Sequence, residues 1–244
     1  ELGVIDQFVT DPAEAVKDAV MVVLAIPLGA MQDIMERIAP ALSADCILTD
    51  VGSAKGSVVS AAQTVFGEVP RFLVPGHPIA GTEKSGVEAS FVELFQNRRV
   101  ILTPTDVSAA QAVQKVRAMW EACGADVVEM GVAHHDEILA ATSHLPHMLA
   151  YALVDTLARM DDSREIFDFA AGGFRDFTRI ASSDPNMWHD ICLANHDALV
   201  KVLEAFSDDL RLLADAVRRA DSDFLKETFT RAKQARDAFC QNDK

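Results

Sequence analysis

A histidine flanked by prolines and glycines is the side chain in this sequence best suited to acid–base chemistry. His77 lies in the segment Val74–Gly81, which contains two prolines and two glycines and follows a predicted buried strand. An imidazole has a pKa of about 6.5, which suits a general base near neutral pH, and parallel sheets bind ligands at the carboxyl ends of their strands. We therefore expect His77 to be a catalytic base. The alternative is a loop histidine that bonds a backbone carbonyl.

A serine occupies the equivalent place after an earlier predicted strand. Ser53 lies in the middle of the segment Asp50–Gly56, directly after a glycine. Its short hydroxyl could reach a ligand or the ring of His77. The alternative is that Ser53 caps the following helix, because serine is favoured at helix N-termini.

Two histidines lie three residues apart where one predicted helix ends and another begins. The spacing of His144 and His147 lets them share a helical face. With His134 and His135 nearby, a zinc site is a second interpretation. The chain contains no HExxH spacing and no CxxC pair, so we expect a polar ligand contact from one of these histidines rather than a metal site.

Two arginines four residues apart follow a pair of glycines. Arg175 and Arg179 are a candidate clamp for a carboxylate, because a guanidinium offers two parallel donors. The alternative is that they form surface ion pairs with neighbours such as Asp176. Next, Ser183–Pro185 predicts a helix start, which would hold Trp188 near the preceding loop as a ligand wall or as a core residue.

Strands and helices alternate over the first half of the chain. The apolar runs Val20–Ile26 and Cys46–Val51 predict strands that are buried on both faces. Further strands are predicted at residues 71–74, 99–103 and 125–128, and helices at residues 28–39, 55–65 and 108–122. This alternation predicts an α/β domain with a mostly parallel, doubly wound sheet over residues 1–131.

The second half carries no strand signal, and residues 132–244 are predicted to form an all-α domain. Apolar residues recur along one helical seam, at Leu199, Leu203, Phe206, Leu210, Leu213 and Val217. Such a seam is buried either in the chain's own core or across a dimer.

The charge balance limits the classes of partner. Against 22 lysines and arginines stand 37 aspartates and glutamates, which gives a net charge of −15. A surface this acidic argues against nucleic acid and anionic membranes as partners. The four cysteines form no CxxC pair, and no apolar stretch approaches the roughly 18 residues of a membrane span. We therefore expect mostly buried thiols and a cytoplasmic location.

The chain contains no G-x-G-x-x-G turn. Dinucleotide-binding sheets usually open with such a turn, which places the pyrophosphate at a helix N-terminus. We therefore expect a Rossmann-like domain that is incomplete at its N-terminus and lacks its first β-α-β unit. The other interpretation is a protein that never bound a dinucleotide.

Five segments in order along the chain resemble the prephenate and arogenate (cyclohexadienyl) dehydrogenases of tyrosine biosynthesis. They are residues 50–56 (DVGSAKG), 75–86 (PGHPIAGTEKSG), 100–105 (VILTPT), 143–157 (SHLPHMLAYALVDTL) and 172–188 (GGFRDFTRIASSDPNMW). The resemblance implies an NAD(P)-binding domain followed by a helical dimerisation domain, and so a homodimer. It also implies oxidative decarboxylation of prephenate to 4-hydroxyphenylpyruvate, or of arogenate to tyrosine. NAD is the expected cofactor, with NADP left open.

The same resemblance implies roles for individual residues. His77 matches the catalytic histidine that bonds the ring hydroxyl of the substrate, and Ser53 matches the serine that orients this hydroxyl and the nicotinamide. Arg179 matches the arginine that binds the ring carboxylate. The residues predicted around the substrate's side chain are Thr82, His147, Arg175 (often lysine in relatives) and Trp188.

The strand end at Ile26 and Pro27 resembles the part of the domain that lies against the cofactor, and Asp50 joins Ser53 in the predicted cofactor-binding set. Two other functions stay open beside this one. One is a β-hydroxyacid dehydrogenase of the same architecture, with a lysine of the helical domain as its acid–base group. The other is a non-catalytic ligand-binding or dimerisation fragment.

Overall fold

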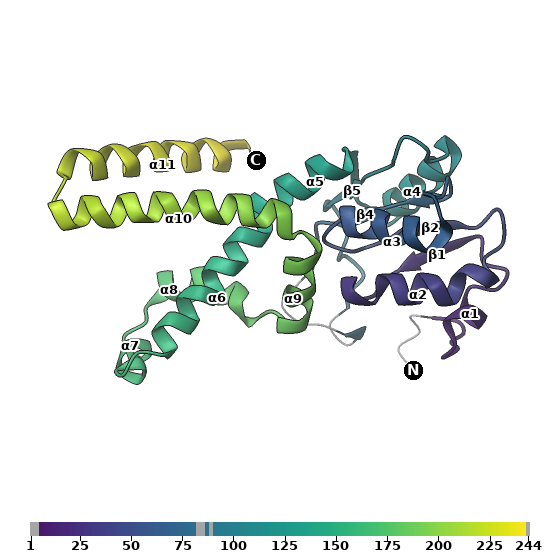
Figure 1. Ribbon diagram of the computed structural model, residues 1–244, viewed down its shortest axis with the longest axis horizontal. Coiled ribbons are helices and arrows are strands. Elements are labelled where there is room, and N and C mark those ends of the chain that lie inside the picture. The colour runs from purple at the N-terminus through teal and green to yellow at the C-terminus, as the bar shows by residue number, and fades with distance from the viewer. Residues whose placement is uncertain (1–4, 82–85, 88–89, 243–244) are drawn as a thin grey trace. The chain divides into compact units, whose positions relative to one another are not determined.

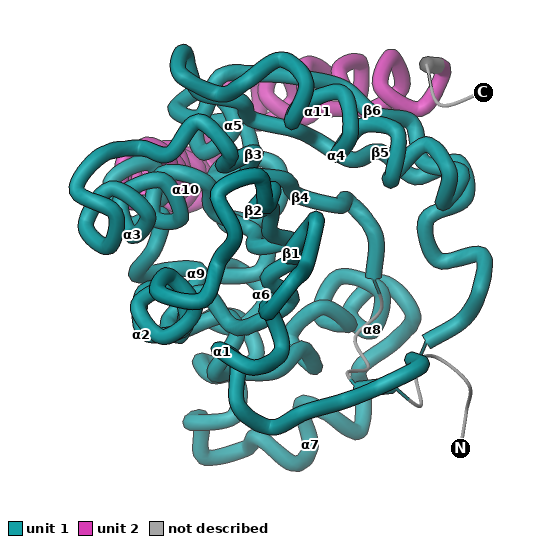
Figure 2. The backbone as a smooth tube through the Cα atoms, turned by 90° about the vertical axis from the view of Figure 1, so that its right-hand side faces the viewer, with its two compact units in different colours: residues 1–199 teal, residues 200–244 magenta. Residues whose placement is uncertain are grey.

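The computed structural model describes residues 5–81, 86–87 and 90–242. The chain divides into two compact units, residues 1–199 and residues 200–244, which Figure 2 draws in teal and magenta. The predicted domain boundary at residue 131 falls inside the first unit and stays a prediction.

The first part of unit 1 alternates strands and helices, as the apolar runs predict (Figure 1). In chain order these elements are α1 (Pro12–Ala15), β1 (Met21–Leu24), α2 (Met31–Ile38), β2 (Ile47–Asp50), α3 (Gly56–Phe66), β3 (Leu73–Val74), β4 (Gly76–Pro78), β5 (Arg99–Leu102), α4 (Ala110–Ala122) and β6 (Asp126–Glu129). Short 3-10 turns at Leu28–Ala30 and Ala39–Ala41 flank α2.

Most strand pairs are parallel, as predicted for this domain. Strands β1, β2 and β3 pair in that order and in parallel, and β5 pairs in parallel with β6. The pair β4–β5 is antiparallel, with His77 opposite Ile101. Pro75 separates β3 from β4 and, having no N–H, cannot extend the ladder between them.

The prediction that His77 lies in a loop is wrong, because β4 places it in a strand. Glycine and proline on either side lower the intrinsic strand propensity of this segment. The segment pairs with β5 all the same, and Ile79 continues the ladder by donating its N–H to the carbonyl of Arg99 at 2.8 Å. The strand fixes the backbone of His77 more firmly than a loop would.

Two apolar cores lie in this part of the unit. The first includes the buried residues Leu24, Met31, Met35, Ile38, Leu48, Val58 and Leu73, from β1, α2, β2, α3 and β3. The second includes Ile47, Val74, Val100, Leu102, Val116, Trp120 and Val127, from β2, β3, β5, α4 and β6. Strands β2 and β3 contribute residues to both cores. Their carboxyl ends, and the segments that follow them, are therefore held on both sides.

The rest of unit 1 is helical, as predicted. It contains α5 (Val132–Leu139), α6 (Leu145–Ala158), α7 (Ser163–Asp168), α8 (Gly172–Thr178), a 3-10 turn (Arg179–Ser182) and α9 (Pro185–Ala194). The break expected before Pro146 is instead a π-helical turn, Ala140–His144, that connects α5 to α6. A π turn carries one more residue than an α turn and often occurs at functional sites.

Helices α10 (His196–Arg219) and α11 (Ser222–Asn242) supply the residues of unit 2. Ala220 joins them with a φ of 52°, and Asp221 caps α11 by accepting the N–H of Phe224. The predicted apolar seam lies on α10, where Leu210 is 54% and Val217 is 67% exposed in the single chain. The seam is therefore only partly buried by the chain itself.

None of the helices in the described ranges is long and apolar enough to cross a membrane. The expectation of mostly buried cysteines is wrong. Cys46 is buried and Cys192 half-buried, whereas Cys123 and Cys240, near helix C-termini, are exposed.

Candidate active site

A buried ion pair ties the end of β2 to the start of β4. Asp50, the last residue of β2, pairs with Lys55, and both side chains are fully buried. The Asp50 carboxylate accepts the N–H groups of Gly52 at 2.8 Å and Gly76 at 3.2 Å, and Nζ of Lys55 donates to the Gly76 carbonyl at 2.6 Å. Burial lowers the pKa of Lys55, although Asp50 opposes the shift. The pair therefore fixes the strand that carries His77.

A residue from far along the chain caps the amino end of α3. The N-cap position of α3 is Lys55, which makes no capping bond through its side chain. Instead, the carboxylate of Asp136 in α5 accepts the N–H groups of Lys55 and Gly56, each at 2.8 Å. Burial raises the pKa of Asp136, but bonds from His135 and these two N–H groups outweigh it and lower the pKa overall. The capping role considered for Ser53 therefore belongs to Asp136.

His77 is held by a second histidine. Its Nδ1 lies 2.9 Å from Nε2 of His135, and Nδ1 of His135 lies 2.8 Å from Oδ1 of Asp136. Burial, followed by the charges of Lys55, His135 and His144, holds the pKa of His77 well below its usual value of 6.5. The ring is therefore neutral at pH 7. Because Nδ1 is engaged, Nε2 is the nitrogen left for a ligand.

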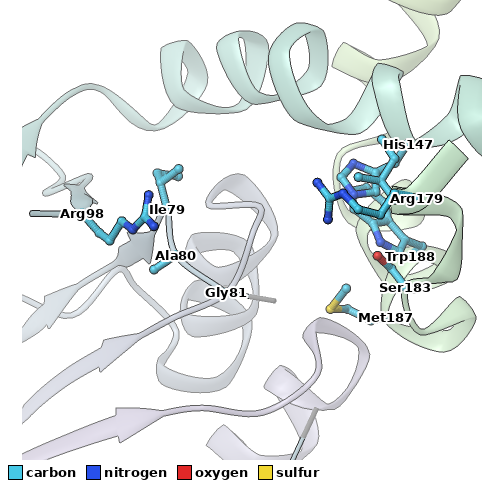
Figure 3. Close-up of a pocket in the computed structure, with 10 residues that line it drawn as sticks. Ile79, Ala80, Gly81, Arg98, His147, Arg179, Ser183, Met187 and Trp188 are labelled. Carbon is cyan, nitrogen blue, oxygen red and sulfur yellow. The ribbon is translucent and has the colours of Figure 1, made fainter. Parts of the chain in front are cut away.

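A cavity of about 380 Å³ lies beside this strand (Figure 3). One side is lined by Ile79, Ala80, Gly81 and Arg98, and the other by His147, Arg179, Ile180, Ser183, Met187 and Trp188. In Figure 3 the guanidinium of Arg179 extends from the helical side toward the side that carries Arg98 and Ile79. In a protein of net charge −15, this cavity has an arginine on each side and is suited to an anion.

The helical wall is ordered by the start of α9. Asp184 accepts the N–H groups of Asn186 at 2.8 Å and Met187 at 2.9 Å, and Pro185 takes the first turn, as the sequence predicts. The Tyr151 hydroxyl donates to the Ser183 carbonyl at 2.6 Å and holds this start against α6.

Trp188 is both a core residue and a cavity wall. It is 6% exposed, and the ring of His147 stacks on it with centroids 3.7 Å apart and planes 22° apart. The ring of His144 meets it edge-on at 6.0 Å. His147 donates from Nδ1 to the Ser143 carbonyl at 2.9 Å, which directs its Nε2 away from the helix backbone.

A second cavity, of about 600 Å³, lies at the carboxyl ends of β1 and β2. It is lined by Ala25, Ile26, Pro27, Leu28, Val51, Gly52, Ser53, Asp184, Asn186, Met187 and Ile191. A Cβ on Gly52 would lie 2.6 Å from Leu28 Cδ2 and 2.9 Å from Asp50 Oδ2, so a larger residue there would have to displace these side chains. These mostly apolar walls, at the edge where parallel sheets bind nucleotides, suit the flat ring of a nicotinamide.

The predicted site residues fall into groups. Arg179, His147 and Trp188 share the first cavity, and Ile26, Pro27 and Ser53 share the second. Asp50 is buried behind the second cavity with its carboxylate bonded inside the protein. Arg175 is exposed on α8 and is absent from both linings. Thr82 lies outside the described residues.

Four residues around His77 and the cavity were not predicted from the sequence: Lys55, Arg98, Asp136 and Tyr151. His135 was considered only as a zinc ligand, yet it is the partner of His77. The adjacent pair His135–Asp136 was the available signal, since a carboxylate beside a histidine can orient it. Over the described residues, no group of three potential ligands could hold a metal ion, and neither cavity is lined by a lysine.

The fold and these two cavities define a class, the nucleotide-dependent dehydrogenases that join an α/β domain to a helical one. The chain belongs to the prephenate dehydrogenase family. Residues 1–129 match the nucleotide-binding domain of prephenate dehydrogenase, and residues 132–231 match its dimerization domain. The predicted family, two-part fold class, dehydrogenase function and nucleotide cofactor are thereby confirmed.

Individual relatives agree with this assignment. The chain is 42% identical to cyclohexadienyl dehydrogenase of Zymomonas mobilis over 234 residues, which is 95% of this chain and 79% of that protein. It is 37% identical to prephenate dehydrogenase of Bacillus subtilis over 97% of this chain and 64% of that protein. The crystal structure of Aquifex aeolicus prephenate dehydrogenase with hydroxyphenyl propionate and NAD+ is similar with a TM-score of 0.88. It is 39% identical, with 96% of this chain and 82% of that chain covered.

Proposed function

We propose that this chain oxidatively decarboxylates prephenate to 4-hydroxyphenylpyruvate with NAD+, and that it also accepts arogenate. One observation carries the proposal: His77 is buried, neutral at pH 7 and held through Nδ1, on the strand that leads into a cavity containing Arg179. The relatives support the choice of substrates. One is named cyclohexadienyl dehydrogenase, and another binds hydroxyphenyl propionate and NAD+.

His77 acts on the ring hydroxyl of the substrate. The neutral imidazole takes the hydroxyl proton at Nε2 while the ring carbon is oxidised, and returns it to the phenolate oxygen after CO₂ has left. A positioned base of this kind contributes about 10²–10⁴-fold to the rate. Ser53 orients the same hydroxyl from the second cavity.

The carboxylate and the side chain of the substrate, which share one ring carbon, are held by different groups. Arg179 binds the ring carboxylate through charge-assisted bonds until it is lost as CO₂. Trp188 and His147 surround the side-chain end, where Trp188 excludes water. Arg175 and Thr82 stay predicted contacts at that end.

His147 also supports acceptance of arogenate. Burial lowers the pKa of His147, and its Nδ1 donates to the Ser143 carbonyl. The neutral ring therefore presents an acceptor at Nε2, which complements the ammonium group of arogenate. Prephenate carries a keto group there and is held by its two carboxylates instead.

The second cavity holds the nicotinamide end of the cofactor. Ile26 and Pro27 form its apolar wall, and Ser53 offers a hydroxyl at its edge. When bound, NAD+ supplies the hydride acceptor. Asp50 acts indirectly, by fixing Gly52 and Gly76 beside this wall.

We further propose a homodimer formed through the helical domain. Its support is the match of residues 132–231 to a dimerization domain, together with the exposed seam residues Leu210 and Val217. Mass measurement in solution at several protein concentrations tests it. The cytoplasmic location stays a prediction.

The test of the proposed reaction is NADH formation with prephenate and arogenate in parallel. We would run it with this chain and, as a positive control, with the Aquifex aeolicus relative. We expect turnover of both substrates, and His77→Asn should lower kcat by about 10²–10⁴-fold while KM changes less than about threefold. The proposal fails if this chain binds hydroxyphenyl propionate and NAD+ but turns over neither substrate under conditions in which the relative is active.

A further inference from the structure

The carboxylate of Asp136 lies at the end of a chain of hydrogen bonds that reaches His77. Its Oδ1 accepts from the Lys55 N–H and lies 2.8 Å from Nδ1 of His135, while Oδ2 accepts from the Gly56 N–H. Its lowered pKa means that this group is ionised at pH 7 and can only accept. The partner nitrogen, Nδ1 of His135, must therefore carry a proton.

The protonation of His135 in turn determines which nitrogen of His77 carries a proton. A neutral imidazole carries one proton, so protonation of His135 at Nδ1 leaves a lone pair on Nε2. Nε2 of His135 lies 2.9 Å from Nδ1 of His77, which donates to it as long as His135 carries a single proton. The opposite arrangement would set two lone pairs, or two N–H groups, against each other in a site where His135 is fully buried.

We propose that Asp136, acting through His135, fixes His77 in the tautomer protonated at Nδ1, which makes Nε2 the base that receives the substrate's hydroxyl proton. This inference deepens the proposed function and rests on it for the identity of the proton. It makes His135 and Asp136 positioning residues, because neither contacts the reacting atoms. The charged and titratable groups that face His77 are Lys55, His135 and His144.

The proposal explains why a carboxylate is buried beside a helix start. A single N-cap needs only one acceptor for the helix N–H groups, and asparagine or serine would serve. Asp136 instead accepts from three donors, two on α3 and one on His135. Only an ionised carboxylate can satisfy all three and still accept, without donating, at the histidine.

The experiment compares two substitutions of His135. Glutamine places an acceptor close to the position of the imidazole Nε2, whereas methionine has a similar size and offers no strong acceptor. His135→Gln therefore keeps the partner of His77 and His135→Met removes it. A role in packing alone predicts the same behaviour from both variants.

The first readout is the tautomer itself, from two-bond ¹H–¹⁵N correlation spectra of the imidazoles at pH 7, with His77→Asn used to assign the His77 signals. We expect His77 to be protonated at Nδ1 in the unmodified chain and in His135→Gln, and to shift toward the Nε2-protonated form in His135→Met. The proposal is overturned if the unmodified chain shows His77 protonated at Nε2, as a doubly protonated His135 would impose. This measurement needs no substrate, and it decides the matter even if His135→Met fails to fold or the chain turns over neither proposed substrate.

The second readout is the pH profile of kcat. We expect His135→Met to lose about 10- to 100-fold in kcat with KM changed less than about twofold, and the acid limb of its profile to move. His135→Gln should recover most of this loss. Equal kcat values and equal pH profiles for the two variants would contradict the proposal.

Discussion

The two sides of the candidate site differ in how deeply their polar side chains are buried. Around His77, the charged groups Asp50, Lys55 and Asp136 are buried and bonded to one another or to backbone groups. On the helical wall, Arg179 is exposed and His147 is half-buried. A buried, bonded network holds one geometry at the reacting end, whereas the binding end presents an exposed arginine to the cavity.

The largest effect is expected where the buried network loses a charge. Lys55→Met leaves the Asp50 carboxylate buried without its ammonium partner, which should lower the free energy of unfolding by about 3–5 kcal/mol. Urea unfolding measures this change. Lys233→Met is the matched control, because Lys233 and Asp237 form an exposed pair on α11 whose loss should cost less than about 1 kcal/mol.

Adding Asp50→Asn to Lys55→Met separates the cost of the unpaired buried charge from the cost of lost packing. The amide removes the unpaired charge and can still accept from one of the two glycine N–H groups, so part of the lost stability should return. A double variant no more stable than Lys55→Met would show that the cost comes from packing and not from the buried charge.

A smaller effect is expected on the open side of the site. Arg179→Ala removes the guanidinium from the cavity and should raise KM for prephenate by about 10- to 100-fold, as for the loss of a bond to a charged group, with kcat changed less than about threefold. Steady-state kinetics measure both constants. Arg164→Ala, an exposed arginine on α7, serves as the control.

Arg175→Ala tests whether the two arginines act as a pair. Because Arg175 is absent from the cavity lining, its substitution should raise KM less than that of Arg179. Equal increases in KM would show that both guanidinium groups bind the substrate and would contradict the assignment of Arg179, and not Arg175, to the cavity.

The smallest effect concerns pH. Burial lowers the pKa of His144 from 6.5 to about 4, and burial also lowers the pKa of His77. The folded chain therefore binds fewer protons than the unfolded chain below pH 6.5, and its stability is lost as the pH falls from there toward 4.

From His144 alone we expect a loss of about 1–2 kcal/mol by pH 5.5, measured by urea unfolding at successive pH values. His144→Gln should flatten this dependence. His196→Gln, at an exposed histidine, should leave it unchanged. A dependence that is the same in all three chains would exclude His144 as its source.

Local patterns in the sequence predicted much of the fold. The apolar run before Val51 gave strand β2, and the Ser183–Pro185 pattern gave the start of α9 with Asp184 as its cap. Both depend on residues next to each other in the chain. The family motifs placed Arg179, His147 and Trp188, which share one cavity.

The hydrogen-bond network that holds His77 could not be predicted from local sequence patterns. The bond from Gly56 to Asp136 joins residues 80 apart in the sequence, and that from His77 to His135 joins residues 58 apart. No periodicity in the sequence connects such positions. The glycine- and proline-rich segment around His77 predicts a loop from its composition, and only pairing with β5 makes it a strand. The contact of Arg98 with the cavity could not be predicted for a similar reason, because only folding brings this residue to the cavity.

The π turn between α5 and α6 has a consequence for insertions and deletions. A π turn fits one extra residue into a single turn, so removing one residue from Ala140–His144 would restore an α turn and leave α6 close to its present phase relative to α5. His135, Asp136, His147 and Tyr151 would then keep facing their present partners. A deletion within regular α6, between His147 and Tyr151, would instead rotate Tyr151 by about 100° away from Ser183. The π turn is thus the place between α5 and α6 where a one-residue deletion should disturb the site least.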